Sequence, residues 1–419
     1  MGDDAGGWFD EARFGMFVHW DHASQAGLEV SWPLVGGLGN LPGDPVGIEE
    51  YHSTAATFAP EPHAAREWAA AARAAGMRYA VLTTRHHNGF SLWPSAVSDW
   101  SVGRFLPGRD LVREFVDAFR AEGLRVGFYY SLSDWHHPDY PAFTEADKPY
   151  SFLAYRRPDD PGAWDRYLDY LFAQVHELLT DYGDVSVLWF DGQWERTPWE
   201  WKADELRALV RELQPDCLVN DRLPLQGDFE TPEQFVPAEP PEGRWETCLT
   251  MNRSWGHVPA DTRYKSARDL VHTLCETAGR GGNLLLNVSP RGDGSLPPEQ
   301  LERLAVVGDW VAAHGEAVFA TGAGLAPWQF YGPTTQRDDT TYLHLLMRPY
   351  DSVTVRGVPI RRIAGVRHVP SERALTFHTR AAVIDELFNA DPVGEAIIEV
   401  PEDLVDDHAT VLALDVTPA

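Results

Sequence analysis

The chain has 419 residues, of which 44% are hydrophobic, so it can bury the core of one large domain and a smaller module. Its formal net charge of −28 argues against a nucleic-acid partner, because phosphate binding needs clustered Lys and Arg. Three cysteines without a CxxC pair argue against a disulfide framework or a zinc ribbon.

The N-terminal sequence has no basic start, apolar run or cleavage motif of a secretory signal. No stretch approaches the ~20 apolar residues that a membrane span needs. We therefore expect a cytoplasmic protein without a membrane partner. A homo-oligomer is left open.

Apolar runs typical of strands alternate with helical patterns over the first 325 residues. Seven runs predict strands at Phe14–Trp20, Tyr79–Thr84, Arg125–Ser131, Val185–Asp191, Cys217–Asp221, Trp245–Thr250 and Asn283–Val288. Six helices are predicted at Pro62–Ala75, Asp110–Glu122, Trp164–Tyr182, Trp199–Leu213, Ala267–Ala278 and Pro298–His314. The strands are almost continuously apolar, as in sheets buried on both faces, and no GxGxxG follows the first of them. We therefore predict an α/β fold, a (β/α)8-type barrel over residues 1–325.

After residue 325 the helical period fades and short β-like runs appear between Pro and Gly residues. The runs are Thr341–Met347, Ser352–Val355, Ala374–Phe377, Ala396–Val400 and Thr410–Leu414. This pattern predicts a small antiparallel β-sandwich over residues 326–419.

Polar side chains gather where the predicted barrel strands end, which is where such barrels carry their active sites. His19, His86, His87, Tyr129 and Asp191 all have this placement.

Asp191 ends the run VLWFD and precedes Gly192, which lets the chain turn away from the carboxylate. This placement suits a nucleophile or general base, and it also suits an Asp that caps a loop. Glu233 and Glu246 are candidates for a second carboxylate. A retaining glycosidase needs two carboxyl groups about 5–5.5 Å apart, a distance that sequence spacing cannot show.

The three strand-end histidines, His19, His86 and His87, could hold a metal, but no HxH or HExxH is present. Neutral imidazoles that bond sugar hydroxyls fit equally well. Tryptophans near these residues could wall a sugar or fill the barrel. Filling the core is expected more for Trp20 and Trp93 than for Trp189 and Trp255, and Trp32 also lies near these polar residues.

A series of motifs from Phe14 to about Thr321 resembles the α-L-fucosidases of glycoside hydrolase family 29. The matching runs are FGMFVHW, YAVLTTRHHNGFSLWPS, RDLV, GLRVGFYYSLSDW, VLWFDGQWE, VNDR, TPEQF, RWETCLTMNRSWG, GRGGNLLLNVSPRGDGSLP and GEAVFATG. The resemblance implies a retaining exo-α-L-fucosidase that acts on a fucosylated oligosaccharide or glycoconjugate through a fucosyl–Asp intermediate. It implies neither a cofactor nor a metal.

The resemblance also implies roles for single residues. Asp191 is similar to the family's nucleophile and Glu233 to its acid/base, with Glu246 as the fallback. The implied substrate-binding residues are Phe17, His19, Trp32, His86, His87, Tyr129, Trp189, Arg222, Glu246 and Trp255. Asp21, Arg85 and Asn88 depart from the family's usual pattern next to this pocket. Two other classes stay open, a metal-dependent barrel hydrolase and a non-catalytic glycan-binding protein.

Overall fold

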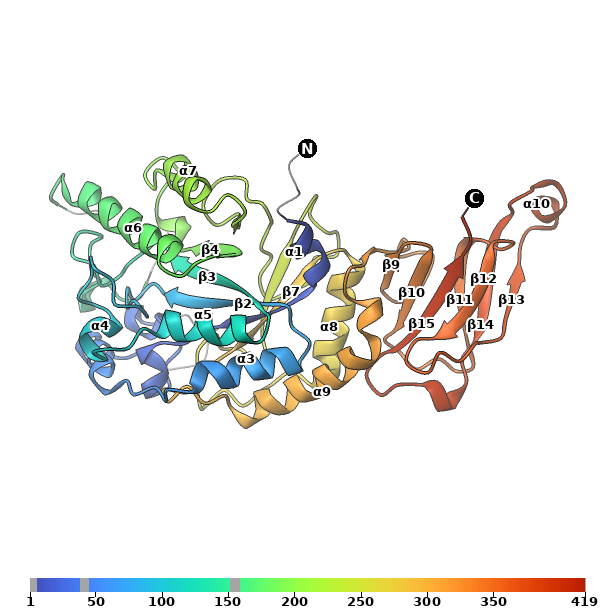
Figure 1. The fold of residues 1–419 in the computed structure, drawn as a ribbon, viewed down its shortest axis with the longest axis horizontal. Helices are drawn as coiled ribbons and strands as arrows, with labels where there is room; N and C mark the ends of the chain where they lie inside the picture. Colours follow the sequence, from blue (N-terminus) through green and yellow to red (C-terminus); the bar gives the residue numbers. More distant parts are fainter. Residues whose placement is uncertain (1–5, 38–44, 151–158, 419) are drawn as a thin grey trace.

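A barrel of parallel strands forms the first and larger part of the molecule (Figure 1). The computed structural model describes residues 6–37, 45–150 and 159–418. The barrel strands are β1 (Phe14–Val18), β2 (Tyr79–Arg85), β3 (Arg125–Ser131), β4 (Val187–Asp191), β5 (Leu218–Val219), β6 (Glu246–Thr250) and β7 (Asn283–Val288). They form one sheet in the order β5-β4-β3-β2-β1-β7-β6, and every pair in it is parallel.

An irregular segment closes the gap between the two edge strands, β5 and β6. Parallel bridges join Asn220 to Phe229 on one side and Glu230 to Trp245 on the other, followed by a bridge from Glu233 to Cys248. The segment 229–233 therefore takes the place of an eighth strand. Its position matters for function because it carries Glu233 to the same end of the barrel as Asp191.

Helices cover the outside of the sheet, as Figure 1 shows. They are α1 (Gly7–Ala12), α2 (Ile48–Ser53), α3 (Ala64–Ala74), α4 (Val102–Phe105), α5 (Leu111–Ala121), α6 (Ala163–Thr180), α7 (Ala203–Leu213), α8 (Ala267–Gly279) and α9 (Pro298–His314). Helix α5 illustrates how the sequence sets them. Asp110 caps it by accepting from Arg113 N at 2.9 Å, Phe115 and Phe119 pack one turn apart on its buried face, and Gly123 turns the chain with φ of +72°.

Two antiparallel sheets follow the barrel, and the one that contains β8 and β9 packs beside α8 (Figure 1). One has the order β12-β15-β10-β9-β8 and the other β11-β14-β13. Their limits are β8 (Gly322–Ala323), β9 (Thr334–Arg337), β10 (Thr340–Leu345), β11 (Ser352–Pro359), β12 (Ile363–His368), β13 (Phe377–Arg380), β14 (Val393–Glu399) and β15 (Thr410–Val416), with α10 (Val383–Phe388) between β13 and β14. Val355 and Ile398 of one sheet share a core with Leu412 and Leu414 of the other.

The predicted fold class, a barrel followed by a β-sandwich, is confirmed. Strands β3 and β7 and helix α9 have the predicted limits. Strand β8 already belongs to the C-terminal sheet, and the domain limits of 1–325 and 326–419 stay a prediction. Three strands of this sheet, β8, β9 and β12, were not predicted, because their sequences lack a continuous apolar run.

Candidate active site

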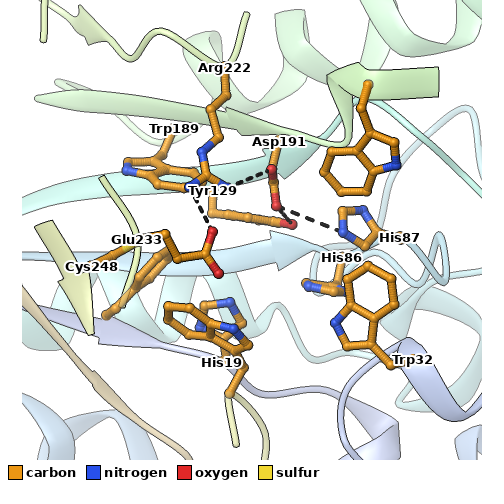
Figure 2. Close-up of a pocket in the computed structure, with 13 residues that line it drawn as sticks. His19, Trp32, His86, His87, Tyr129, Trp189, Asp191, Arg222, Glu233 and Cys248 are labelled. Carbon is orange, nitrogen blue, oxygen red and sulfur yellow. Dashed lines mark hydrogen bonds and ion pairs between the residues drawn. The ribbon is translucent and has the colours of Figure 1, made fainter. Parts of the chain in front are cut away.

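A cavity of about 230 Å³ opens at the carboxyl ends of the barrel strands. Figure 2 shows its lining, which carries carboxylates, imidazoles and aromatic rings. The lining residues are Phe17, His19, Trp32, His86, His87, Tyr129, Trp189, Asp191, Trp194, Arg222, Glu233, Cys248 and Trp255. Its volume is below the ~300 Å³ of the smallest pockets for drug-sized ligands, so it suits a ligand of about one sugar residue.

Asp191 is the last residue of β4 and points into the cavity. Trp189 lies two residues earlier, so strand alternation places both side chains on the inner face. Tyr129 Oη donates to Asp191 Oδ2 at 2.9 Å, and Arg222 Nη1 donates to Asp191 Oδ1 at 3.1 Å. His87 Nε2 lies 3.8 Å from Oδ2. Each carboxylate oxygen is therefore held by a donor, which fixes the group in a rigid orientation.

Arg222 joins the two carboxylates of the cavity. While its Nη1 contacts Asp191, its Nη2 donates to Glu233 Oε2 at 2.8 Å (Figure 2). Its guanidinium also lies 4.7 Å from the ring centre of Trp189. Burial works to lower the pKa of Arg222, but Asp191 and Glu233 more than offset it and raise this pKa above its ordinary value. Arg222 therefore stays a cation.

The two carboxylates differ in their access to solvent. The side chain of Asp191 is 11% exposed, whereas that of Glu233 is 38% exposed. Among the described residues, only one oxygen of Glu233 has a hydrogen-bond partner, which leaves Oε1 free. A deep, immobilised carboxylate thus faces a more accessible one across the cavity.

Three histidines line the cavity with their Nδ1 atoms already engaged. His19 Nδ1 lies 2.7 Å from Asn287 Oδ1, His86 Nδ1 lies 2.6 Å from Ser31 Oγ, and His87 Nδ1 lies 2.6 Å from Ser131 Oγ. Burial is the main cause that lowers the pKa of all three, for His19 to about 4. They are therefore neutral imidazoles at ordinary pH.

The hydrogen bonds around His19 also assign its tautomer. Asn287 Nδ2 donates to the Trp255 carbonyl at 2.8 Å, so the Asn287 oxygen faces His19 and accepts from its Nδ1–H. His19 Nε2 then carries a lone pair. Because His19 lines the cavity, this nitrogen is suited to accept a hydrogen bond from a ligand hydroxyl group.

Phe17 and Trp255 form an apolar wall, with ring centres 6.0 Å apart. The backbone of this wall is held by a buried carboxyl group. Glu29 Oε1 accepts from Trp255 N at 2.7 Å and Oε2 accepts from Gly256 N at 2.9 Å. Burial raises the pKa of Glu29 to about 8. An apolar wall beside donors and acceptors suits a sugar with a C–H-rich patch.

Glu246 corrects one prediction, because it does not line the cavity. It begins β6, whereas Cys248, two residues later on the same inner face, reaches the lining. The Glu246 carboxyl group is fully buried and accepts from Trp189 Nε1 at 3.2 Å and from Tyr79 Oη. Burial raises its pKa to about 7. This buried position outside the lining supports neither direct contact with a substrate nor the fallback role of acid/base.

Two lining residues, Trp194 and Cys248, were not among the predicted site residues. Trp194 lies in a 3-10 helix at Gln193–Glu195, directly after β4, with its ring nearly parallel to Trp32 at 6.4 Å. Its place after the strand-end Asp191 was a usable signal. Cys248 had no signal of its own, since it lies in the middle of β6 and not at the strand end.

Two of the three departures from the family pattern contact each other. Asn88 Nδ2 donates to Asp21 Oδ2 at 2.7 Å, and Asn88 N donates to Ser31 Oγ, the partner of His86. If position 88 carried a carboxylate, it would repel the carboxylate of Asp21, whereas the amide of Asn88 donates to it. The pair therefore supports His86 from behind and lies outside the cavity lining.

Metal ligation and membrane spanning each concern the part of the chain that the structure describes. Within it, no group of three or more His, Cys, Asp and Glu side chains is arranged to hold a metal ion. In the same ranges, no helix combines the length and the apolar character that crossing a membrane requires.

Comparisons with known proteins agree with this architecture. The sequence profile described as Alpha-L-fucosidase matches residues 3–316. Alpha-L-fucosidase isoenzyme 1 from Paenibacillus thiaminolyticus is 35% identical, with a TM-score of 0.85 over 99% of each chain. The alpha-fucosidase of Thermotoga maritima is 28% identical, with a TM-score of 0.75 over 97% of this chain and 96% of that one. Human tissue alpha-L-fucosidase is 32% identical over 350 residues, 77% of this chain and 71% of its own.

Together, the barrel, its carboxylate-bearing cavity and these relatives define a glycoside hydrolase. The chain belongs to the α-L-fucosidase family.

The buried proton of Glu246 gives a prediction about stability. An unfolded Glu ionises near 4.5, whereas Glu246 holds its proton to about pH 7 in the folded protein. Between these values only the unfolded chain loses the proton, so the wild type loses on the order of 3 kcal/mol of unfolding free energy as pH rises. Glu246→Gln lacks this loss. Its unfolding free energy in urea, relative to wild type, should therefore increase from pH 4.5 to 7 and then level off. A difference that does not change with pH would contradict the assignment.

Proposed function

We propose that the protein is a retaining exo-α-L-fucosidase that removes terminal α-L-fucose from glycans. Asp191 is the nucleophile and Glu233 the acid/base. The observation that carries the proposal is the contact of both carboxylates with one guanidinium group, that of Arg222, inside a cavity sized for one sugar residue. Membership of the α-L-fucosidase family supplies the sugar.

In the first step, a carboxylate oxygen of Asp191 attacks the anomeric carbon of the bound fucose. Glu233 donates its proton to the glycosidic oxygen, and the bond from that oxygen to the anomeric carbon breaks. The products are a fucosyl–Asp191 ester and the free aglycone. The more exposed position of Glu233 supports this role, because the acid must reach the leaving group at the mouth of the cavity.

In the second step, the ionised Glu233 takes a proton from a water molecule, whose oxygen attacks the same anomeric carbon. The ester bond breaks, and Asp191 regains its charge. Tyr129 and Arg222 hold the Asp191 carboxylate at both oxygens, so the leaving carboxylate is stabilised as it forms. Two displacements at one carbon give net retention of configuration.

The remaining lining residues support recognition of a neutral sugar. Neutral imidazoles at His19, His86 and His87 offer ring nitrogens to hydroxyl groups without introducing charge. Phe17 and Trp255 provide an apolar wall for the methyl group of fucose. The related Thermotoga maritima alpha-fucosidase has been solved with a mechanism-based inhibitor, in agreement with a shared covalent route in the family.

The configuration of the product tests the proposed function. With an aryl α-L-fucoside as substrate, the fucose released first should be the α anomer, which then mutarotates. Proton NMR during the first minutes of turnover distinguishes the two anomers. A β-L-fucose product formed first would mean a single displacement and would exclude the fucosyl–Asp191 ester.

Asp191→Asn should reduce kcat on the same substrate by several orders of magnitude, because no other group can form the ester. Asn has nearly the same shape and can still accept from Tyr129, so the thermal unfolding temperature should change little. A folded variant that kept a tenth of wild-type activity would show that Asp191 is not the nucleophile.

Glu233→Ala should impair hydrolysis of fucosylated oligosaccharides much more than that of an aryl fucoside, whose leaving group needs little protonation. Azide should restore the rate on the aryl fucoside by attacking the fucosyl–enzyme without a general base, and α-fucosyl azide should accumulate, because azide replaces water in the second displacement. Glu246→Ala is the control and should show no azide rescue. Rescue of the control in place of Glu233→Ala would reverse the two assignments.

A further inference from the structure

Glu246 has no role in the chemistry above, yet it lies directly behind the site. We propose that Glu246 is a positioning residue that holds the indole of Trp189, and through it the two donors that orient Asp191. This inference rests on the proposed function, since it concerns the group assigned as nucleophile.

The Glu246 carboxyl group has a fixed place in the interior of the barrel. Both of its oxygens accept a hydrogen bond, Oε1 from Trp189 Nε1 at 3.2 Å and Oε2 from Tyr79 Oη. Tyr79 is itself confined, because its ring lies across Gly15 of β1. A Cβ atom at Gly15 would come within 2.5 Å of Tyr79 Cζ. Tyr79 thus fixes one oxygen of the Glu246 carboxyl group, and the other oxygen fixes the indole of Trp189.

Trp189 in turn contacts both donors of Asp191. The ring of Tyr129 stacks on the indole at 5.6 Å with an interplanar angle of 21°, and the Arg222 guanidinium lies 4.7 Å from the indole centre. These are the same two side chains that donate to Asp191 Oδ2 and Oδ1. A single indole therefore supports the groups that fix both carboxylate oxygens.

The hydrogen bond to Glu246 determines how that indole lies. Trp189 is 1% exposed, so its N–H has no access to bulk water and needs a protein acceptor. A carboxyl oxygen that accepts from the indole N–H also polarises the ring, which strengthens the attraction of Trp189 for the Arg222 guanidinium. Without Glu246 the indole can shift in its plane, and Tyr129 and Arg222 shift with it. A displacement of about 1 Å at a reacting group can lower a rate about 10²-fold.

Three variants test the proposal by steady-state kinetics on an aryl α-L-fucoside. Glu246→Leu removes the acceptor and should lower kcat by about 10- to 100-fold, with a smaller effect on KM. Glu246→Gln keeps an oxygen for the indole N–H and can donate to Tyr79, so it should restore most of the lost kcat. In a Trp189→Phe background, which has no indole N–H, Glu246→Leu should cause little further loss.

Glu177→Leu is the matched control. Glu177 Oε2 accepts from Trp93 Nε1 at 2.7 Å, so this change also breaks a carboxylate–indole hydrogen bond, but Trp93 does not line the cavity. The control should lower the unfolding temperature and leave kcat unchanged. If Glu246 were only a stability residue, Glu246→Leu would behave in the same way, and the proposal would be wrong.

A second readout does not depend on turnover. The indole N–H resonance of Trp189, identified by its absence from the spectrum of Trp189→Phe, should move in Glu246→Leu and stay unmoved in Glu177→Leu. If the wild type fails to hydrolyse fucosides, the proposed function fails, and the indole resonance still tests the contact. If fucosides are hydrolysed but folded Glu246→Leu has wild-type kcat, or Glu246→Gln is as impaired as Glu246→Leu, the positioning role is refuted.

Discussion

The shared guanidinium of Arg222 is the interaction on which the site depends. Two carboxylates in one partly dehydrated cavity repel each other and lose hydration, and a cation bound to both offsets each cost. Arg222 can reach both because it follows the end of β5, while the segment 229–233 returns beside that strand. The segment that closes the barrel is therefore also the segment that brings Glu233 to Asp191.

The other residues that line the cavity add no further charge around Arg222, Asp191 and Glu233. Burial leaves His19, His86 and His87 neutral, and each has its Nδ1 bonded to a polar side chain, which orients the ring. Two buried carboxyl groups lie behind the cavity lining, where Glu29 holds the backbone at Trp255 and Glu246 holds Trp189. The surface that meets a ligand thus combines one fixed cation and two carboxylates with neutral donors, acceptors and aromatic rings.

Much of this arrangement was accessible from the sequence, because a parallel barrel brings the carboxyl ends of its strands to one rim. Asp191 ends an apolar strand, His87 follows one, and Tyr129 lies two residues before the end of a third. That placement alone predicted that they would meet. The exception is Glu246. Strand alternation correctly predicts that the side chains of Glu246 and Cys248 both point into the barrel. Alternation does not show how far along the barrel axis a side chain lies from the cavity. Cys248 reaches the lining, whereas Glu246, two residues earlier, lies in the buried layer below it.

The sequence by itself determined the fold class, the barrel strands with continuous apolar runs and the strand-end residues that gather at one rim, because these follow from local periodicity and from family motifs. Only the tertiary structure decided that Arg222 joins Asp191 to Glu233, that Trp194 and Cys248 complete the cavity, and that Glu246 lies behind Trp189. Each of these depends on contacts between elements far apart in the chain. Such contacts are set by how the strands close and how deeply each side chain packs, and a linear pattern records neither.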